Sequence, residues 1–213
     1  MGDLEFDDVV FGYGGSLLFD GFSASFPTGS ISCIVGPNGC GKSTLAKLAM
    51  GMVKPTSGHV RIAGRDASSL AARERARLLG VLVQQQEAPM MTVRELVMCG
   101  RFPCCGSLSR LSRGDEERID EALLLAGVSE LRDRSLQSLS GGQRQRVRMA
   151  MVLAQDTPIV LFDEPTSGLD GGNMRIIASV LTNSAAGGKT ILLITHDKEL
   201  MQACCNFRWE LGQ

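Results

Sequence analysis

The sequence has no long apolar run. No stretch approaches the roughly 18 uninterrupted apolar residues that a membrane-spanning helix requires. The N-terminus reads MGDLE, which is acidic, whereas a secretory signal begins with a basic segment followed by an apolar one. We therefore expect a cytoplasmic protein without a membrane span of its own.

Histidine is scarce as well. The chain has seven cysteines but only two histidines, and no two cysteines form a C-x-x-C pair. Structural zinc sites are usually built from histidines and closely spaced cysteine pairs, so this composition argues against a zinc site. The alternative is a soft-metal site made of Cys99, Cys104 and Cys105. The cysteines otherwise fit a cytoplasmic protein.

An excess of charge of either sign is also missing. Lysine and arginine number 22, aspartate and glutamate number 23, and the net charge is −1. A balanced surface offers no bulk attraction to nucleic acid or to an anionic membrane, so we expect no nucleic-acid partner. The length of 213 residues predicts one domain, or one domain with an appended lobe.

What the sequence does contain is a phosphate-binding loop. Residues 36–44 read GPNGCGKST and match the pattern G-x-x-x-x-G-K-[ST] without a mismatch. A buried strand is expected at Ile31–Val35 and a helix from Ser43 onward, which is the context that this motif requires. Lys42 would provide a cation for the β- and γ-phosphates, and the Ser43 hydroxyl would bind Mg²⁺.

The glycines of this loop permit backbone conformations in which successive N–H groups converge on an anion, and the following helix adds its positive N-terminal end. We therefore predict a polyphosphate site. Its predicted binding residues are Gly36, Asn38, Gly39, Cys40, Gly41, Lys42, Ser43 and Thr44.

Two further apolar strands are predicted to end in polar residues. The strand at residues 158–162 leads into Asp163 and Glu164, and the strand at residues 190–195 leads into His196. In a parallel α/β sheet, ligands bind at the carboxyl ends of the strands. Asp163 is predicted to hold Mg²⁺ or its waters, Glu164 to orient a water for attack on the γ-phosphate, and His196 to contact that phosphate. The alternatives are a solvated acidic turn and a structural histidine.

Tyr13 and Gln84 are two candidates whose roles the sequence leaves open. Antiparallel strands are expected at residues 4–11 and 22–26, and Tyr13 lies in the glycine-rich turn after the first of them. It could stack on a flat ligand such as adenine, or simply pack. Gln84 follows a short apolar strand and could contact both Mg²⁺ and a water, or belong to a polar loop.

The middle of the chain is predicted to be helical. Residues 92–136 have a helical pattern with caps at Thr92 and Ser112, which indicates an inserted helical lobe. The sequence LSGGQ at residues 139–143 opens the next helix. Its Ser-Gly-Gly segment would form a second anion-binding turn. Met90 and Met91 near the start of the lobe either contact a partner helix or belong to the core.

Together and in this order, these motifs resemble the ATP-binding cassette (ABC) ATPases over nearly the whole chain. Residues 36–44 resemble the Walker A motif, residues 159–164 the Walker B motif with its catalytic glutamate, and residues 139–143 the LSGGQ signature. Gln84 resembles the Q-loop glutamine, or Gln85 does if the register slips by one, and residues 167–170 with Asp170 resemble the D-loop. His196 resembles the switch histidine, and Tyr13 resembles the adenine-stacking aromatic residue.

This resemblance implies a fold, an activity and a partner copy. The fold would be α/β: a P-loop NTPase (RecA-like) core with an antiparallel β subdomain, formed by residues 1–88 and 155–213, and an α-helical subdomain at residues 89–154. The activity would be ATP hydrolysis with Mg²⁺. Two such domains, as a homodimer or with a paralogue, would pair head to tail. The ATP of one would then meet the signature residues of the other: Ser140, Gly141, Gly142 and Gln143.

Three segments resemble one branch of the family. TVRELV at residues 92–97, GRFP at 100–103 and LAQDTP at 153–158 are similar to the ATPases of importers for iron-siderophore, haem or cobalamin. This implies a peripheral location at the cytoplasmic face of the cell membrane and a transmembrane permease subunit. A coupling helix of that permease would lie near Met90, Met91 and Arg101. The alternative is a soluble ABC ATPase of DNA repair or of the ribosome.

Overall fold

A computed structural model describes residues 2–83, 89–105, 111–167, 169 and 171–212. The N-terminal part forms a four-stranded antiparallel sheet with the order β2-β1-β4-β5. Its strands are β1 (Gly2–Tyr13), β2 (Ser16–Pro27), β4 (Ser57–Ile62) and β5 (Arg65–Asp66). The strand expected at 22–26 is only the second half of β2. The alternation breaks at Gly21, which has a φ of 73°, where the pairing with β1 shifts register.

The remaining strands form a five-stranded parallel sheet with the order β6-β7-β8-β3-β9. They are β3 (Ile31–Val35), β6 (Leu79–Leu82), β7 (Ile159–Asp163), β8 (Thr190–Ile194) and β9 (Phe207–Glu210). Strands β7, β8 and β3 are neighbours, although they lie far apart in sequence. Their carboxyl ends, each followed by a predicted site segment, therefore meet at one edge of the sheet.

Helices connect these strands. They are α1 (Lys42–Ala49), α2 (Ala72–Ala76), α3 (Val93–Cys99), α4 (Arg113–Leu125), α5 (Gly141–Ala154), α6 (Gly171–Ala186) and α7 (Lys198–Cys204), with short 3₁₀ turns at η1 (Ala67–Ser69), η2 (Ser129–Leu131) and η3 (Leu136–Ser138). The caps predicted at Thr92 and Ser112 are confirmed: each hydroxyl accepts the N–H three residues on, at the starts of α3 and α4.

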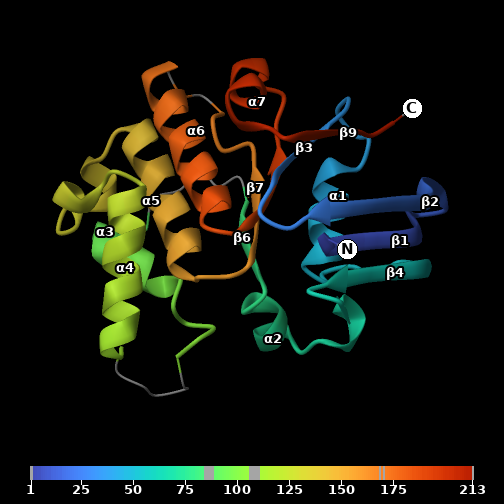
Figure 1. Cartoon of the computed structure of the whole chain (residues 1–213), viewed down its shortest axis with the longest axis horizontal. Helices are drawn as coiled ribbons and strands as arrows, with labels where there is room; N and C mark the ends of the chain where they lie inside the picture. The colour runs from blue at the N-terminus through green and yellow to red at the C-terminus, as the bar shows by residue number, and fades with distance from the viewer. Residues whose placement is uncertain (1, 84–88, 106–110, 168, 170, 213) are drawn as a thin grey trace.

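The parallel sheet separates two hydrophobic cores. Because successive strand residues point to opposite faces, Val160 and Phe162 of β7 pack with helices α3 to α7, whereas Ile159 and Leu161 pack with α1 and the antiparallel sheet. Figure 1 shows this arrangement, with α5 and α6 against one face and α1 with strands β1, β2 and β4 on the other side. The predicted mixed α/β fold is confirmed.

Two further observations concern the membrane and the cysteines. Among the described residues, no helix is both long and apolar enough to cross a bilayer. Cys33 of β3 and Cys205, just after α7, are joined by a disulfide with Cα atoms 6.1 Å apart. Their separation of 172 residues explains why spacing alone could not predict this pair.

Candidate functional site

The glycine loop connects β3 to α1, as the motif predicts. Gly39 and Gly41 have φ values of 83° and 104°, in the left-handed region that favours glycine. At Gly41 a Cβ would also lie 2.5 Å from Cζ of Phe19, whereas at Gly39 nothing lies within 4 Å of one. Helix α1 begins after Gly41 without a side-chain cap, so the peptide dipoles of its first turn face the loop.

Lys42 lies back over this loop. Its Nζ donates hydrogen bonds to the carbonyl oxygens of Gly36 at 2.7 Å and Pro37 at 2.9 Å. The ammonium group is therefore held inside the loop by its own main chain. A lysine in this position adds a positive charge to the converging N–H groups, which is the electrostatic requirement of a polyphosphate site.

A cleft of about 350 Å³ brings four separate segments of the chain together. Its lining consists of Tyr13, Leu18, Asn38, Gly39, Gly41, Lys42, Ser43, Thr44, Asp163, Glu164 and Ile194. Most of these residues were predicted. The two apolar ones, Leu18 and Ile194, were missed because nothing distinguishes them from core residues in the sequence. Gly36 and Cys40 lie outside the lining, and Cys40 packs against the core.

Tyr13 is the last residue of β1 and not part of the turn. It is 48% exposed. Its ring meets that of Phe11 edge to face, with centroids 4.9 Å apart. Of the two roles considered, the packing contact is thus present, and the position in the lining of the cleft is also compatible with stacking on a flat ligand.

The two carboxylates at the end of β7 lie in different environments. Burial raises the pKa of Asp163, and the negative charge of Glu164 adds to this effect while Lys42 opposes it. Glu164 has a φ of 50°, which is unfavourable for a residue other than glycine. Its N–H donates to the carbonyl of Ile194 at 2.8 Å, so β8 helps to hold this backbone conformation.

The side chains of Glu164 and His196 are hydrogen-bonded to each other. His196 Nδ1 lies 2.8 Å from Oε1 of Glu164, and the side chain of Glu164 is 17% exposed while that of His196 is 82% exposed. Two residues that the sequence suggested separately, 32 positions apart, therefore form one unit beside the cleft. Such a pair can hold a carboxylate in place next to a reacting water.

The signature segment lies elsewhere. Ser140 caps α5: its hydroxyl accepts the N–H of Gln143, and the side chain of Gln143 accepts the N–H of Ser140. Ser140 and Gly141 are exposed, and the segment is absent from the described lining of the cleft. The other two predicted residues, Gln84 and Asp170, lie outside the described residues.

The three residues expected near a coupling helix of a permease lie in different environments. Met90 is 89% exposed, but Met91 packs against the core. Arg101, with a side chain only 11% exposed, is paired with Asp115 at 2.9 Å and donates to the carbonyl of Ala154 at 2.7 Å. Arg101 therefore connects the helices of the lobe to one another. Its guanidinium group is engaged in these contacts within the chain.

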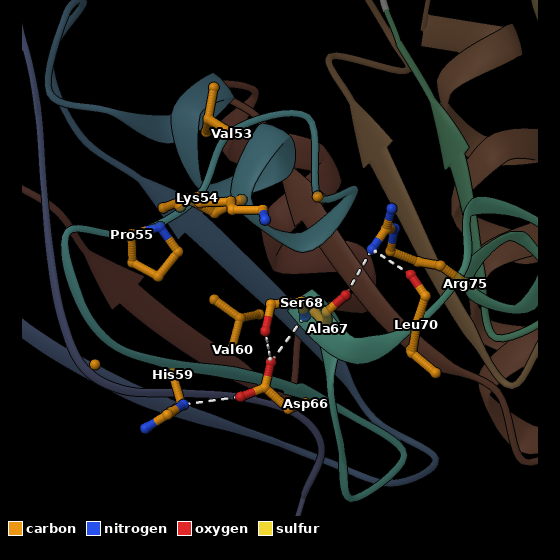
Figure 2. Close-up of a pocket in the computed structure, with 13 residues that line it drawn as sticks. Val53, Lys54, Pro55, His59, Val60, Asp66, Ala67, Ser68, Leu70 and Arg75 are labelled. Atoms are coloured by element: carbon orange, nitrogen blue, oxygen red, sulfur yellow. Dashed lines mark hydrogen bonds and ion pairs between the residues drawn. The ribbon is translucent and has the colours of Figure 1, made fainter.

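Figure 2 shows a second, smaller cavity between α1 and β4, of about 110 Å³. His59 and Asp66 point toward each other at 2.8 Å, and Asp66 also accepts hydrogen bonds from Ser68. Arg75 donates to the carbonyls of Ala67 and Leu70. These charged groups already pair within the chain, and their hydrogen bonds connect β4 and α2 to the segment of β5 and η1.

Comparisons with known proteins agree with this geometry. The sequence model of the family described as ABC transporter matches residues 19–167. The ferric enterobactin transport ATP-binding protein FepC of Escherichia coli (strain K12) is 39% identical over 200 residues, which are 93% of this chain and 73% of that protein. The iron(3+)-hydroxamate import ATP-binding protein FhuC of Bacillus subtilis (strain 168) is 38% identical over 199 residues, 92% of this chain and 74% of that one.

A solved structure is also similar. A transporter described as of the metal-chelate type, in an inward-facing conformation, superposes with a TM-score of 0.85 at 28% identity, covering 99% of this chain and 79% of the other. The similarity thus extends from the sequence motifs to the whole fold. The chain belongs to the ABC transporter family, in which it is an ATP-binding, ATP-hydrolysing transport ATPase.

Proposed function

We propose that this chain is the ATPase subunit of an importer for iron-siderophore complexes, haem, cobalamin or a similar metal chelate. FepC and FhuC are named for ferric enterobactin and iron(3+)-hydroxamate, and the similar solved transporter is of the metal-chelate type. The observation that carries the hydrolytic part is the Glu164–His196 pair at 2.8 Å beside the cleft under the glycine loop.

In this proposal the cleft binds ATP. The N–H groups of the loop between Gly36 and Gly41, and the Lys42 ammonium, hold the phosphates. Asn38, Cys40 and Thr44 belong to the same loop and helix start, and Tyr13 stacks on adenine. Because the loop carries the positive charge and Tyr13 lies at another part of the lining, the nucleotide would extend from one to the other.

The donor set beside the loop fits Mg²⁺. Ser43 and Asp163 line the same cleft and offer the hydroxyl and carboxylate oxygens that this hard cation prefers. A bound cation would also favour the ionised form of Asp163, whose pKa burial otherwise raises. We propose Ser43, Asp163 and Gln84 as the residues that hold Mg²⁺, which would neutralise charge on the phosphates.

The chemistry then depends on Glu164 and His196. Glu164 orients a water in line with the γ-phosphate and accepts its proton, and His196 holds the carboxylate and approaches the same phosphate. Negative charge develops on the oxygens of the transferred phosphoryl group, so several hydrogen-bond donors and cations must surround it at the same time. Lys42 and the loop N–H groups supply some of them from this chain.

The remaining donors would come from a second copy or a paralogue. Ser140, Gly141, Gly142 and Gln143 lie at the start of α5, where Ser140 and Gly141 are exposed and Gly142 is buried, outside the described lining of their own cleft. In a head-to-tail pair they would face the ATP bound by the partner, with Asp170 near the same interface. Closure of the pair would complete the site, and hydrolysis would open it.

The membrane partner in this proposal is a permease subunit. It would hold the chain at the cytoplasmic face of the membrane. Residues 89–154 would act as one helical subdomain that contacts it, and the surface offered there includes Met90 and Phe102, which are 89% and 60% exposed. Flexible methionine and aromatic side chains are suited to a helix in a groove.

A trapping experiment tests the proposal. The Glu164→Gln chain is expressed in its native cell, incubated with ATP and Mg²⁺, extracted in mild detergent and analysed for co-purifying proteins, with Lys42→Ala as the control that should not form the trapped pair. We expect a polytopic membrane protein to copurify with Glu164→Gln. Recovery of soluble protein or nucleic acid alone would contradict the importer proposal.

A further inference from the structure

Three residues beside the Glu164–His196 pair have no role so far. Thr166 follows β7, and Thr195 and Asp197 follow β8, on either side of His196. Both threonines are buried, with exposed fractions of 7% for Thr166 and 1% for Thr195. Buried hydroxyls are usually fully hydrogen-bonded, so their partners show what they hold in place.

Thr195 connects the main chain to the candidate base. Its Oγ1 accepts the N–H of Asp197 at 3.1 Å and donates to Oε2 of Glu164 at 3.4 Å. A hydroxyl has one proton and two acceptor sites, so both bonds can exist together. The bond to Glu164 is longer than the usual O–H···O distance of about 2.7–2.8 Å, so it is a weak restraint on the carboxylate.

Glu164 is thus held through both carboxylate oxygens. His196 binds Oε1 at 2.8 Å, and Thr195 binds Oε2 at 3.4 Å. A β-branched residue such as Thr195 has few side-chain rotamers, and burial restricts it further. Without its hydroxyl, the carboxylate could rotate about the remaining bond to His196.

Asp197 fixes the neighbouring loop. Its Oδ2 accepts the hydroxyl of Thr166 at 3.0 Å, and its Oδ1 accepts the N–H groups of Glu199 and Leu200 at 3.0 and 3.1 Å, which caps α7. The loop that carries Glu164 is therefore tied to the start of α7. Since His196 lies between Thr195 and Asp197, its backbone is fixed on both sides.

The backbone of Glu164 needs such support. A φ of 50° persists only where the surroundings hold it, and the N–H bond to Ile194 is one such restraint. The hydroxyl of Thr195 and the Thr166–Asp197 bond supply two more on the side chain and on the following loop.

We propose that Thr195, Asp197 and Thr166 are positioning residues for ATP hydrolysis, which hold the Glu164 carboxylate in register with His196 and with the attacking water. This inference rests on the proposed role of Glu164 as the base. In this proposal the three residues have no direct contact with phosphate or water. They act through Glu164 and His196, and an error of about 1 Å in such a group can reduce turnover about a hundredfold.

The decisive experiment is a double-mutant cycle on the full chain. Thr195→Val, which keeps the shape but removes the hydroxyl, is made in the wild type and in Glu164→Gln, and kcat, KM and binding of a fluorescent ATP analogue are measured. In the wild type we expect kcat to fall about ten- to a hundredfold, with KM and analogue binding within about twofold. In Glu164→Gln the same change should lower the residual rate by less than about twofold, because the base is already lost.

Two further variants separate positioning from general stability. Thr195→Ser restores the hydroxyl and should recover most of kcat. Thr157→Val is the matched control: Thr157 is 1% exposed, and its hydroxyl accepts the N–H of Gly80 and donates to the carbonyl of Ile159 at the opposite end of β7. Thr157→Val should lower the melting temperature about as much as Thr195→Val does, while leaving kcat unchanged.

The outcomes are distinguishable. A loss from Thr195→Val that is equally large in both backgrounds, or a kcat for Thr157→Val as low as that of Thr195→Val, would overturn the positioning role. If Thr195→Val does not fold, Thr166→Val undergoes the same cycle with Thr166→Ser as its rescue. Undiminished hydrolysis by Glu164→Gln would instead refute the proposed function, and this inference with it.

Discussion

The imidazole of His196 and the carboxylate of Glu164 meet across two neighbouring parallel strands, with Nδ1 and Oε1 2.8 Å apart. The contact exists because β7 and β8 pair in register, with Asp163 opposite Ile194, so that the residues following each strand face each other. It connects the end of one apolar strand to the end of another that lies 32 positions away. Glu164 lines the cleft and His196 lies beside it, and this pair is where we propose the acid–base chemistry.

Glu164→Gln should retain ATP binding but lose turnover. The amide keeps the size and the contact with His196 but cannot accept a proton, so we expect kcat to fall at least about a hundredfold with little change in affinity. Steady-state phosphate release and equilibrium binding of ATP measure the two effects. Glu199→Gln, at the exposed start of α7, is the control and should behave like the wild type. Undiminished phosphate release would remove Glu164 as the base.

Lys42→Ala should have the opposite signature, with weaker ATP binding as its main effect. The change removes the ammonium that lies against the carbonyls of Gly36 and Pro37, and with it the main positive charge of the loop. A charge-assisted hydrogen bond is worth about 2 kcal/mol, so the Kd should rise at least tenfold. Lys47→Ala, which removes an exposed lysine of the same helix, is the control. Equal Kd values for the two variants would contradict the phosphate role.

Gly41→Ala should destabilise the fold itself. The residue has a φ of 104°, and its Cβ would lie 2.5 Å from Cζ of Phe19, so strain and overlap act together. We expect the free energy of unfolding to fall by about 2–3 kcal/mol, as measured by urea denaturation. Gly39→Ala shares the positive φ but meets no atom within 4 Å, and it should cost only about 1 kcal/mol. Equal losses would show that the contact with Phe19 does not matter.

Acid should weaken the helical lobe through Asp115. Hydrogen bonds from Ser112, with the Arg101 guanidinium beside it, lower the pKa of Asp115 to about 2. A carboxylate whose pKa is lower in the folded protein stabilises it above the unfolded pKa, and this contribution disappears as the pH falls from about 4 to about 2.

Urea denaturation of the wild type and Asp115→Asn over this pH range checks the effect. The wild type should be the more stable protein at pH 6, and the difference should shrink toward pH 2. Glu117→Gln is the control, because Glu117 pairs with Arg113 on the surface, where the two side chains are 61% and 94% exposed. A constant difference between wild type and Asp115→Asn would contradict the role of the Asp115 charge.

Most of the candidate site could be predicted because its chemistry is local in sequence. The loop from Gly36 to Thr44 needs consecutive residues to shape one backbone path, and Asp163 and Glu164 need only an apolar strand before them. Thr195 could not be predicted in this way. Its importance comes from a bond to Glu164 of a different strand, and a threonine at a strand end has no distinctive pattern of its own.

Arg101 illustrates the same limit from the other side. The resemblance to the importer ATPases implied a position for Arg101 near a coupling helix of a permease. In the structure its side chain is 11% exposed and paired with Asp115. Whether an arginine faces solvent or an internal carboxylate depends on how α3, α4 and α5 pack, and this packing cannot be predicted from the residues around Arg101 alone.

The sequence by itself determined the kinds of chemistry present: a phosphate loop, carboxylates and a histidine after apolar strands, and a second glycine-rich helix start at Ser140. These follow from backbone geometry and side-chain type over a few residues. Only the tertiary structure decided which of them act together. The strand order places the ends of β7, β8 and β3 at one edge, joins Glu164 to His196, and leaves Ser140 exposed outside the described lining of the cleft, because hydrogen-bonded strand pairing overrides distance along the chain.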